Sequence, residues 1–237
     1  MQEPKNIEQA LVAVNEKIAA ACVRAGRNPE EVTLIAVSKT MPVEALREAM
    51  ACGVVHFGEN RPQELRDKQA EITEPLCWHM IGALQTNKLK YVVGKTVMIH
   101  SVDSESLALA IDAESKKRGV VSEILLEINI AGEESKHGIA PEDAESLARK
   151  VALCENLKIR GLMTVAPYTE TPEENRLYFR KMKQLMVDIN SKNIDNVTMD
   201  VLSMGMTGDY EIAVEEGATL VRVGTGIFGH RTYPQKA

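Results

Sequence analysis

The segment VTLIAVSKT, residues 32–40, indicates the fold class of this chain. Its first six residues are apolar or β-branched throughout, a pattern typical of a strand that is buried on both faces. A helix is predicted before it over residues 6–26, ending at Gly26, and another after it over residues 42–52. A strand enclosed by helices in this way predicts a parallel sheet whose crossovers are helical.

The same alternation of strands and helices repeats along the rest of the chain. Further strands are predicted over residues 54–57, 77–81, 97–102, 123–130, 159–165, 198–203 and 219–224, and further helices over 61–72, 86–93, 104–118, 141–153, 172–191 and 209–216. Eight strands and eight helices without a linker between them favour an α/β fold with one domain over residues 1–237, a (β/α)8 TIM-type barrel. The first helix would cover the eighth strand and close the ring. An open doubly wound sheet remains the alternative.

Composition excludes several classes of function. The 237 residues include 28 Lys and Arg against 34 Asp and Glu, and the basic residues are scattered, so we expect no nucleic-acid partner. Neither a leader peptide nor an apolar segment of membrane-spanning length is recognisable, which predicts a cytoplasmic protein without membrane contact. The four cysteines are far apart and are expected to be reduced thiols. We expect a monomer.

In a parallel barrel, functional groups gather at the carboxyl ends of the strands. Lys39 follows the first strand, Asn60 follows the second, and Met163 lies near the end of the sixth. Partial desolvation at the end of an apolar strand would lower the pKa of Lys39 and leave an amine able to form a Schiff base with a carbonyl. An ordinary solvated loop lysine is the alternative.

Two glycine-rich segments are predicted at the ends of the seventh and eighth strands. The first contains Ser203 and Gly205, and the second contains Gly224 and Thr225. Glycine lets backbone N–H groups approach an anion, and in this fold these two loops commonly bind phosphate, although ordinary glycine turns would look the same. Arg222, within the eighth strand, would lie beside this site.

Other kinds of site are not supported by the sequence. Residues 224–229 match GxGxxG, but too few residues follow for a dinucleotide fold. The five histidines show no i,i+4 pair, so we expect no metal site.

Six segments resemble the YggS/PROSC family of pyridoxal phosphate homeostasis proteins. They are LIAVSKT (34–40), HFGENRPQE (56–64), WHMIGALQTNK (78–88), GLMTVAP (161–167), LSMGMTGD (202–209) and VRVGTGIFG (221–229). The resemblance implies a barrel similar to the N-terminal domain of alanine racemase, with pyridoxal phosphate (PLP) held as a Schiff base. One departure is Thr207, where many members have serine.

The resemblance also implies a role for each matching residue. Lys39 would form the Schiff base, and Asn60 would lie near the cofactor. Ser203 would bind the phosphate group, helped by Gly224 and Thr225, and Arg222 would face the pyridine nitrogen. Met163 and Gly205 would line the site without an obvious single role. His79 and His137 receive no role.

These expectations lead to a hypothesis of intracellular PLP (vitamin B6) homeostasis, with PLP-dependent enzymes as possible recipients. An arginine facing the pyridine nitrogen makes the ring a poor electron sink, which favours a carrier over an enzyme. Two alternatives stay open: a weak PLP-dependent amino-acid racemase, and a PLP-free Schiff-base aldolase, which would also need a phosphate cradle.

Overall fold

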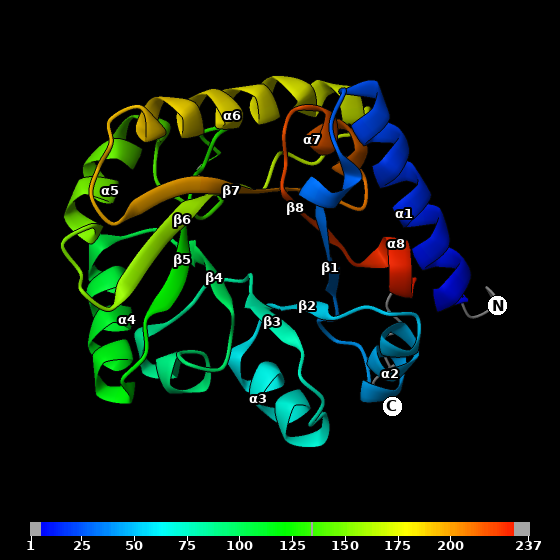
Figure 1. Ribbon diagram of the computed structural model, residues 1–237, viewed down its shortest axis with the longest axis horizontal. Coiled ribbons are helices and arrows are strands. Elements are labelled where there is room, and N and C mark those ends of the chain that lie inside the picture. Colours follow the sequence, from blue (N-terminus) through cyan, green and yellow to red (C-terminus); the bar gives the residue numbers. More distant parts are fainter. Residues whose placement is uncertain (1–5, 134, 230–237) are drawn as a thin grey trace.

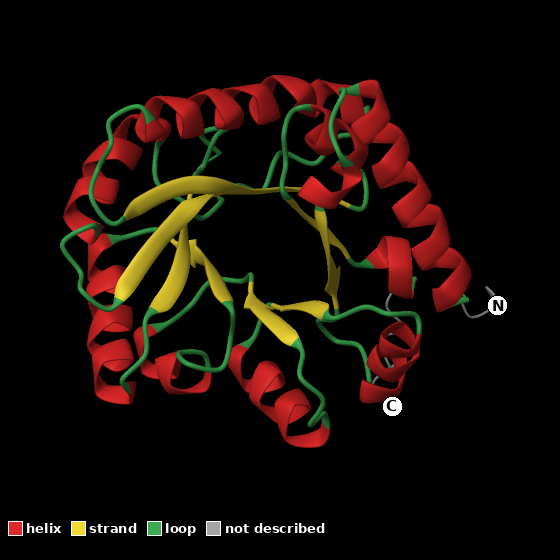
Figure 2. Ribbon diagram, viewed as in Figure 1, coloured by secondary structure: helices red, strands yellow, loops and turns green. Residues whose placement is uncertain are grey.

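Eight parallel strands form a closed barrel in the computed structural model, which describes residues 6–133 and 135–229. Each strand pairs with the next along the chain, and β1 pairs with β8 to close the ring. Helices surround the strands on the outside (Figures 1 and 2). The strands are β1 (Thr33–Val37), β2 (His56–Glu59), β3 (Cys77–Met80), β4 (Met98–Val102), β5 (Ser122–Glu127), β6 (Leu157–Met163), β7 (Val197–Met206) and β8 (Leu220–Val223). The predicted TIM-type barrel is confirmed, and the open sheet is wrong.

The helices follow the predicted order, with local differences. They are α1 (Ile7–Arg24), α2 (Val43–Ala51), α3 (Pro62–Glu71), α4 (Glu105–Arg118), α5 (Ala144–Val151), α6 (Arg176–Asn190), α7 (Tyr210–Glu215) and α8 (Thr225–Phe228), with 3-10 turns η1 (Pro29–Glu31), η2 (Thr86–Tyr91), η3 (Pro141–Asp143) and η4 (Pro172–Asn175). The predicted helix over 86–93 is therefore a 3-10 segment. The single turn α8 was not predicted, because four residues are too few to show a helical period.

Helix α1 covers the seam where the barrel closes. It begins at the cap residue Asn6, whose side chain accepts a hydrogen bond from the backbone N–H of Gln9. Its apolar face packs against α7, α8 and α2, which flank β8 and β1 (Figure 1). The prediction that the first helix completes the ring is confirmed.

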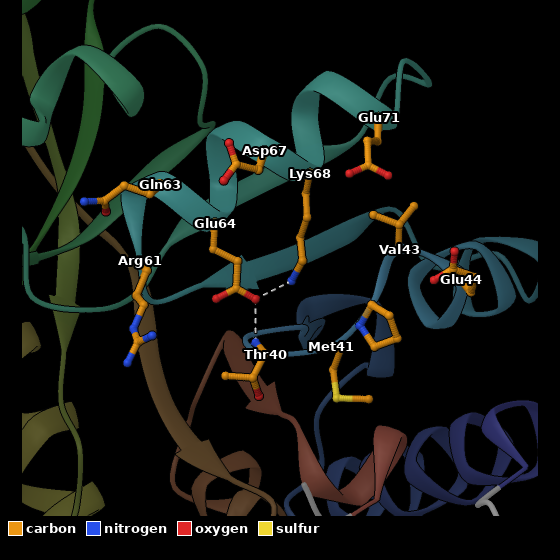
Figure 3. Close-up of a pocket in the computed structure, with 11 residues that line it drawn as sticks. Thr40, Met41, Val43, Glu44, Arg61, Gln63, Glu64, Asp67, Lys68 and Glu71 are labelled. Carbon is orange, nitrogen blue, oxygen red and sulfur yellow. Dashed lines mark hydrogen bonds and ion pairs between the residues drawn. The ribbon is translucent and has the colours of Figure 1, made fainter. Parts of the chain in front are cut away.

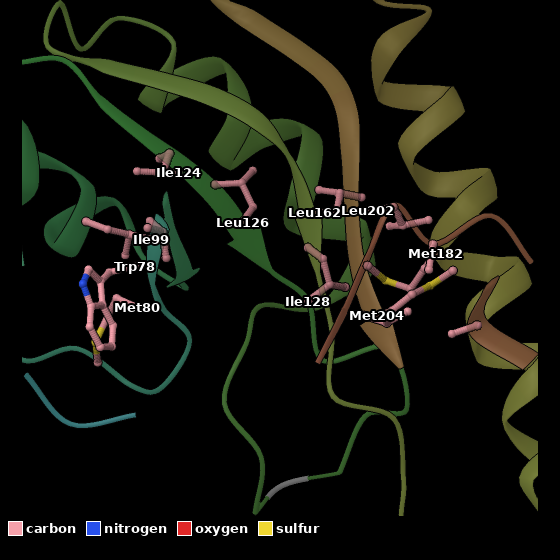
Figure 4. Packing of buried hydrophobic residues seen from close by; sticks show 14 of the residues in the cluster. Trp78, Met80, Ile99, Ile124, Leu126, Ile128, Leu162, Met182, Leu202 and Met204 are labelled. Carbon is pink, nitrogen blue, oxygen red and sulfur yellow. The ribbon is translucent and has the colours of Figure 1, made fainter. Parts of the chain in front are cut away.

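Alternating strand residues divide the apolar core into two layers. The outer layer lies between strands and helices and includes Met80, Leu126, Leu202 and, from α6, Met182 (Figure 4). The inner layer comes from strand residues that point the other way, into the barrel: Ile35, Met98, Leu125, Met163 and Leu220. Buried polar side chains, among them His79, His100 and Ser203, share the interior with these apolar residues.

Two strand ends differ from the prediction by three residues. Strand β5 ends at Glu127, three residues early, because Ile128 pairs with Ile139 and the side-chain amide of Asn129 both donates to and accepts from the backbone of Glu133. Strand β7 continues to Met206, which pairs with Arg222 after a register shift. The predicted loop beginning at Ser203 is thus strand until residue 206.

We expect Gly161→Ala to be strongly destabilising. A Cβ at Gly161 would lie 1.8 Å from the carbonyl oxygen of Val201 on the neighbouring strand, beside the register shift between β6 and β7. Because backbone must move to relieve this clash, the free energy of unfolding should fall by about 3 kcal/mol. Gly119→Ala is the matched control: it also has a positive φ but nothing within 4 Å, so we expect a loss of about 1 kcal/mol. Urea unfolding of both variants checks this, and equal losses would contradict the steric explanation.

Among the residues that the structure describes, no helix combines the length and apolar character needed to cross a membrane. The four cysteines are free thiols.

Candidate functional site

A pocket of about 630 Å³ opens at the carboxyl ends of the strands. A volume of this size suits a small organic ligand. Its lining comes from segments spread along the chain: Val37, Lys39, Asn60, Ile81, Glu133, Lys136, Val165–Thr169, Pro172, Asn175, Met206–Asp209, Arg222, Gly224 and Thr225. The barrel therefore brings distant segments together at one end, as the fold predicts.

Five of the eight predicted site residues line this pocket together: Lys39, Asn60, Arg222, Gly224 and Thr225. They come from the ends of β1, β2 and β8, which are neighbours because the barrel is closed. The amine, amide, guanidinium and glycine loop that the sequence singled out thus face one cavity.

The turn that carries Lys39 is fixed by side chains from β2 and α3. Figure 3 shows the two from α3, Glu64 and Lys68, beside Thr40. Lys68 donates to the carbonyl oxygen of Ser38 at 2.7 Å, and the Ser38 hydroxyl donates to Glu59 at 2.6 Å. On the other side of Lys39, the backbone N–H of Thr40 donates to the carboxylate of Glu64 at 2.5 Å. Thr40 has a φ of 64°, an uncommon conformation for a non-glycine residue that these bonds hold in place.

Glu59 and Lys68 form a buried ion pair behind that turn. Their Oε1 and Nζ atoms are 2.7 Å apart, and their side chains are 0% and 6% exposed. Burial raises the pKa of Glu59, while the charge of Lys68 opposes this shift. The second carboxylate oxygen, Oε2, is buried without a hydrogen-bond partner, so the charge of Glu59 depends on Lys68 and Ser38.

The glycine loop after β8 directs backbone donors at a single oxygen. The hydroxyl of Thr207 accepts from the N–H of Gly224 at 3.3 Å and from the N–H of Gly226 at 3.1 Å. A side chain at Gly226 would collide with Val223, with a Cβ distance of 2.6 Å, so glycine is required there. Two N–H groups converging on one oxygen form the kind of cradle that suits a phosphate group.

Arg222 forms part of the pocket wall and is almost fully buried. It donates to the hydroxyl of Ser203 at 2.6 Å and to the carbonyl oxygen of Thr164 at 2.8 Å. Desolvation lowers its pKa to about 10, so the guanidinium remains charged at neutral pH. A guanidinium has only donors to offer a ligand.

Three predicted residues lie behind the pocket rather than along it. Ser203 is fully buried, and its hydroxyl contacts Arg222 and His100. Met163 belongs to the inner apolar layer. Gly205 has a φ of 89°, and a Cβ there would come within 2.5 Å of the Ala213 side chain, so it allows α7 to pack on β7. Their contact with a ligand stays a prediction.

Several residues at the site were not found from the sequence. Asp209 accepts from the N–H of Met206 and from the amide of Asn175, both at 2.7 Å, and so fixes the loop after β7. Glu127, at the end of β5, is 7% exposed. The sequence signal that could have identified Glu127 is its position as a charged residue at the end of an apolar strand. Among the described residues, no group of three or more His, Cys, Asp or Glu could hold a metal ion.

We expect Glu127→Gln to change how stability depends on pH. Desolvation, and second the charge of Asp103, raise the pKa of Glu127 from 4.5 to about 7. The folded chain therefore binds this proton more tightly than the unfolded chain, and stability falls as the pH rises from 4.5 to about 7. The loss should be about 3 kcal/mol in the wild type and absent in the variant. Urea unfolding across this pH range measures it, and parallel curves for the two proteins would contradict the assignment.

Comparison with known proteins supports a family assignment. Residues 11–232 match the family described as "Alanine racemase, N-terminal domain". The pyridoxal phosphate homeostasis protein of Aquifex aeolicus is 45% identical over 229 residues, which cover 96% of this chain and 100% of that protein. PipY of Synechococcus elongatus, solved with PLP bound, is 38% identical with a TM-score of 0.79, covering 91% of this chain and 100% of PipY. An alanine racemase of Clostridium difficile shares the fold at 14% identity and a TM-score of 0.75, covering 96% of this chain and 57% of the racemase.

Sequence identity at this level over nearly the full chain establishes family membership. The structural match to PipY shows that the barrel is shared as well. The six segments singled out in the sequence contain most of the residues that line the pocket. The chain therefore belongs to the YggS/PROSC family, the pyridoxal phosphate homeostasis proteins, whose barrel is that of the alanine racemase N-terminal domain.

Proposed function

We propose that this chain binds PLP in the barrel-end pocket, covalently through Lys39, and acts in intracellular PLP homeostasis. The observation that carries the proposal is the joint placement of Lys39, Arg222 and Gly224 in one pocket. An amine able to bond the aldehyde thus shares a cavity with a donor for the ring nitrogen and a phosphate cradle. The PLP-bound structure of PipY supports the same cofactor.

The residues present fit the cofactor. The cradle formed by Gly224 and Gly226 already binds one oxygen, that of Thr207, in the way it would bind a phosphate oxygen. Arg222 would hold the ring nitrogen unprotonated, because a charged donor repels an added proton. PLP supplies an electron sink for amino-acid chemistry when its ring nitrogen is protonated, and Arg222 weakens that capacity. Asn60 completes the wall of the pocket.

The comparison with the relatives supports a role in holding PLP rather than in catalysing a reaction with it. The Aquifex homeostasis protein is matched over its whole length, whereas the alanine racemase chain extends well beyond the shared barrel. We propose that residues 1–237 act as one cofactor-binding domain, in the cytoplasm and as a monomer, and that PLP-dependent enzymes receive the cofactor.

Cofactor transfer separates this function from catalysis. The PLP-loaded chain is mixed with an excess of a PLP-free aminotransferase, and the aminotransferase activity is followed. The expected result is activation at the rate at which PLP leaves the chain, together with no racemisation of alanine beyond that of free PLP. Tight PLP retention with fast racemisation would instead establish the weak racemase.

A further inference from the structure

A row of hydrogen-bonded side chains crosses the polar half of the barrel interior. Arg222 of β8 donates to Ser203 of β7 at 2.6 Å, and the Ser203 hydroxyl is 3.0 Å from Nδ1 of His100 on β4. Nε2 of His100 is 3.0 Å from Nδ1 of His79 on β3, and Nε2 of His79 is 3.0 Å from Nδ1 of His56 on β2. The row begins at the pocket wall and ends at the partly exposed His56.

Arg222 gives this row a direction. A guanidinium only donates, so the oxygen of Ser203 accepts from Arg222. The single hydroxyl proton of Ser203 is then available to Nδ1 of His100, which must accept it and carry its own proton on Nε2. In the same way, the Nε2–H of His100 donates to Nδ1 of His79, and the Nε2–H of His79 donates to Nδ1 of His56. Each imidazole is therefore neutral with its proton on Nε2.

The opposite direction is possible but unfavourable. If His100 donated to Ser203, the hydroxyl would accept from both His100 and Arg222, and its own proton would need a third partner. Ser203 is fully buried, and an unpaired buried donor disfavours that arrangement by about tenfold or more. The resting direction is thus from the pocket towards His56.

The burial of these three histidines favours the neutral form of each imidazole. Desolvation, and second the positive charge that His56 carries when protonated, lower the pKa of His79 to about 3. Desolvation also places the pKa of the fully buried His100 well below its ordinary value, and a smaller desolvation effect lowers the pKa of His56. The charge of Arg222 contributes to the shift at His100, which is the nearest of the three along the row.

We infer that His100, His79 and His56 form a one-directional relay that positions Ser203 and Arg222 at the pocket, with every histidine proton on Nε2. The Ser203 hydroxyl proton is committed to His100, so Ser203 presents only an acceptor to Arg222 and keeps the guanidinium in place. These histidines are positioning residues: in the described chain they lie beneath the pocket rather than among its lining residues.

The tautomers can be measured by correlating imidazole ring protons with both ring nitrogens in 15N-labelled protein. The expected result for the wild type is a protonated Nε2 and an unprotonated Nδ1 at His100, His79 and His56. A proton on Nδ1 of any of them would overturn the relay. The measurement uses the chain without cofactor, so its outcome is independent of the proposed PLP binding.

Two variants of Arg222 test the origin of the direction. Arg222→Lys keeps a cation that only donates and should retain the wild-type tautomers. Arg222→Met removes the donor, so His100 should show a mixture of tautomers, and the change should reach His56, which is four hydrogen bonds away from Arg222. A purely structural role for the row would leave the tautomer at His56 unchanged. A folded Arg222→Met protein with all three tautomers unaltered would overturn the inference, and if that variant does not fold, the wild-type measurement decides.

Discussion

Replacement of Lys39 by alanine is expected to abolish covalent retention of PLP. Lys39 lines the pocket beside Arg222 and Gly224, on a turn fixed by bonds to the residues before and after it. Wild-type protein loaded with PLP should absorb in the near ultraviolet or visible, and borohydride should fix the cofactor permanently to Lys39. The variant should lose that absorbance band and all covalent label. Peptide mass mapping after borohydride identifies the labelled residue.

Lys136 provides the matched control for this experiment. It is the other lysine that lines the described pocket, and it donates to the carbonyl oxygen of Ala166 at 2.9 Å. Lys136→Ala should still yield protein labelled at Lys39. Label found on Lys136 in the wild type would show that PLP bonds to Lys136 and would contradict the assignment of Lys39. A wild-type protein that stays colourless with added PLP would contradict cofactor binding and favour the aldolase alternative.

Replacement of Lys68 by methionine is expected to cost about 3–5 kcal/mol of stability, the usual result of removing one partner of a buried ion pair. Glu59 would keep its carboxylate in a fully buried position with one oxygen already unpartnered. The variant would also release the carbonyl of Ser38, so the turn carrying Lys39 should loosen and PLP binding should weaken. Urea unfolding gives the first quantity and absorbance titration the second.

The double variant Lys68→Met with Glu59→Gln separates charge from packing. Removing the stranded carboxylate should recover most of the lost stability, because the cost comes from an uncompensated charge. Lys117→Met, at a lysine whose side chain is 79% exposed, should leave the urea midpoint unchanged. A double variant as unstable as Lys68→Met alone would show that packing around Lys68, and not its charge, is what matters.

The sequence predicted the barrel well because its strongest signals are local. Each buried strand is a short apolar run, each helix has its own period, and the alternation alone specifies parallel strands. Boundaries were less certain where pairing with a distant strand decides them: β7 extends to Met206 because of its partner Arg222 on β8, which no local pattern reveals.

The candidate site was predicted only in part for a related reason. Lys39 and Gly224 follow the carboxyl ends of strands, where the functional groups of a parallel barrel gather. The three histidines of the row, by contrast, lie on three different strands and show no pattern in the sequence. They meet only because each of them faces the interior of the barrel. Likewise, Ser203 and Gly205 are close to the pocket in sequence, yet the extra length of β7 places them behind it.

The pairing of β1 with β8 also has a consequence for how the protein is made. Residues 33–36 pair with residues 220–223, so the first strand to leave the ribosome must wait for the last, about ten to forty seconds at ordinary rates of synthesis. During that interval β1 has no partner on its β8 side, an exposed apolar edge that invites wrong associations. Lys39 is likewise made long before Arg222 and Gly224. The nascent chain therefore acquires its pocket only after residues 220–225 have been made, when ring closure and site assembly become the same event.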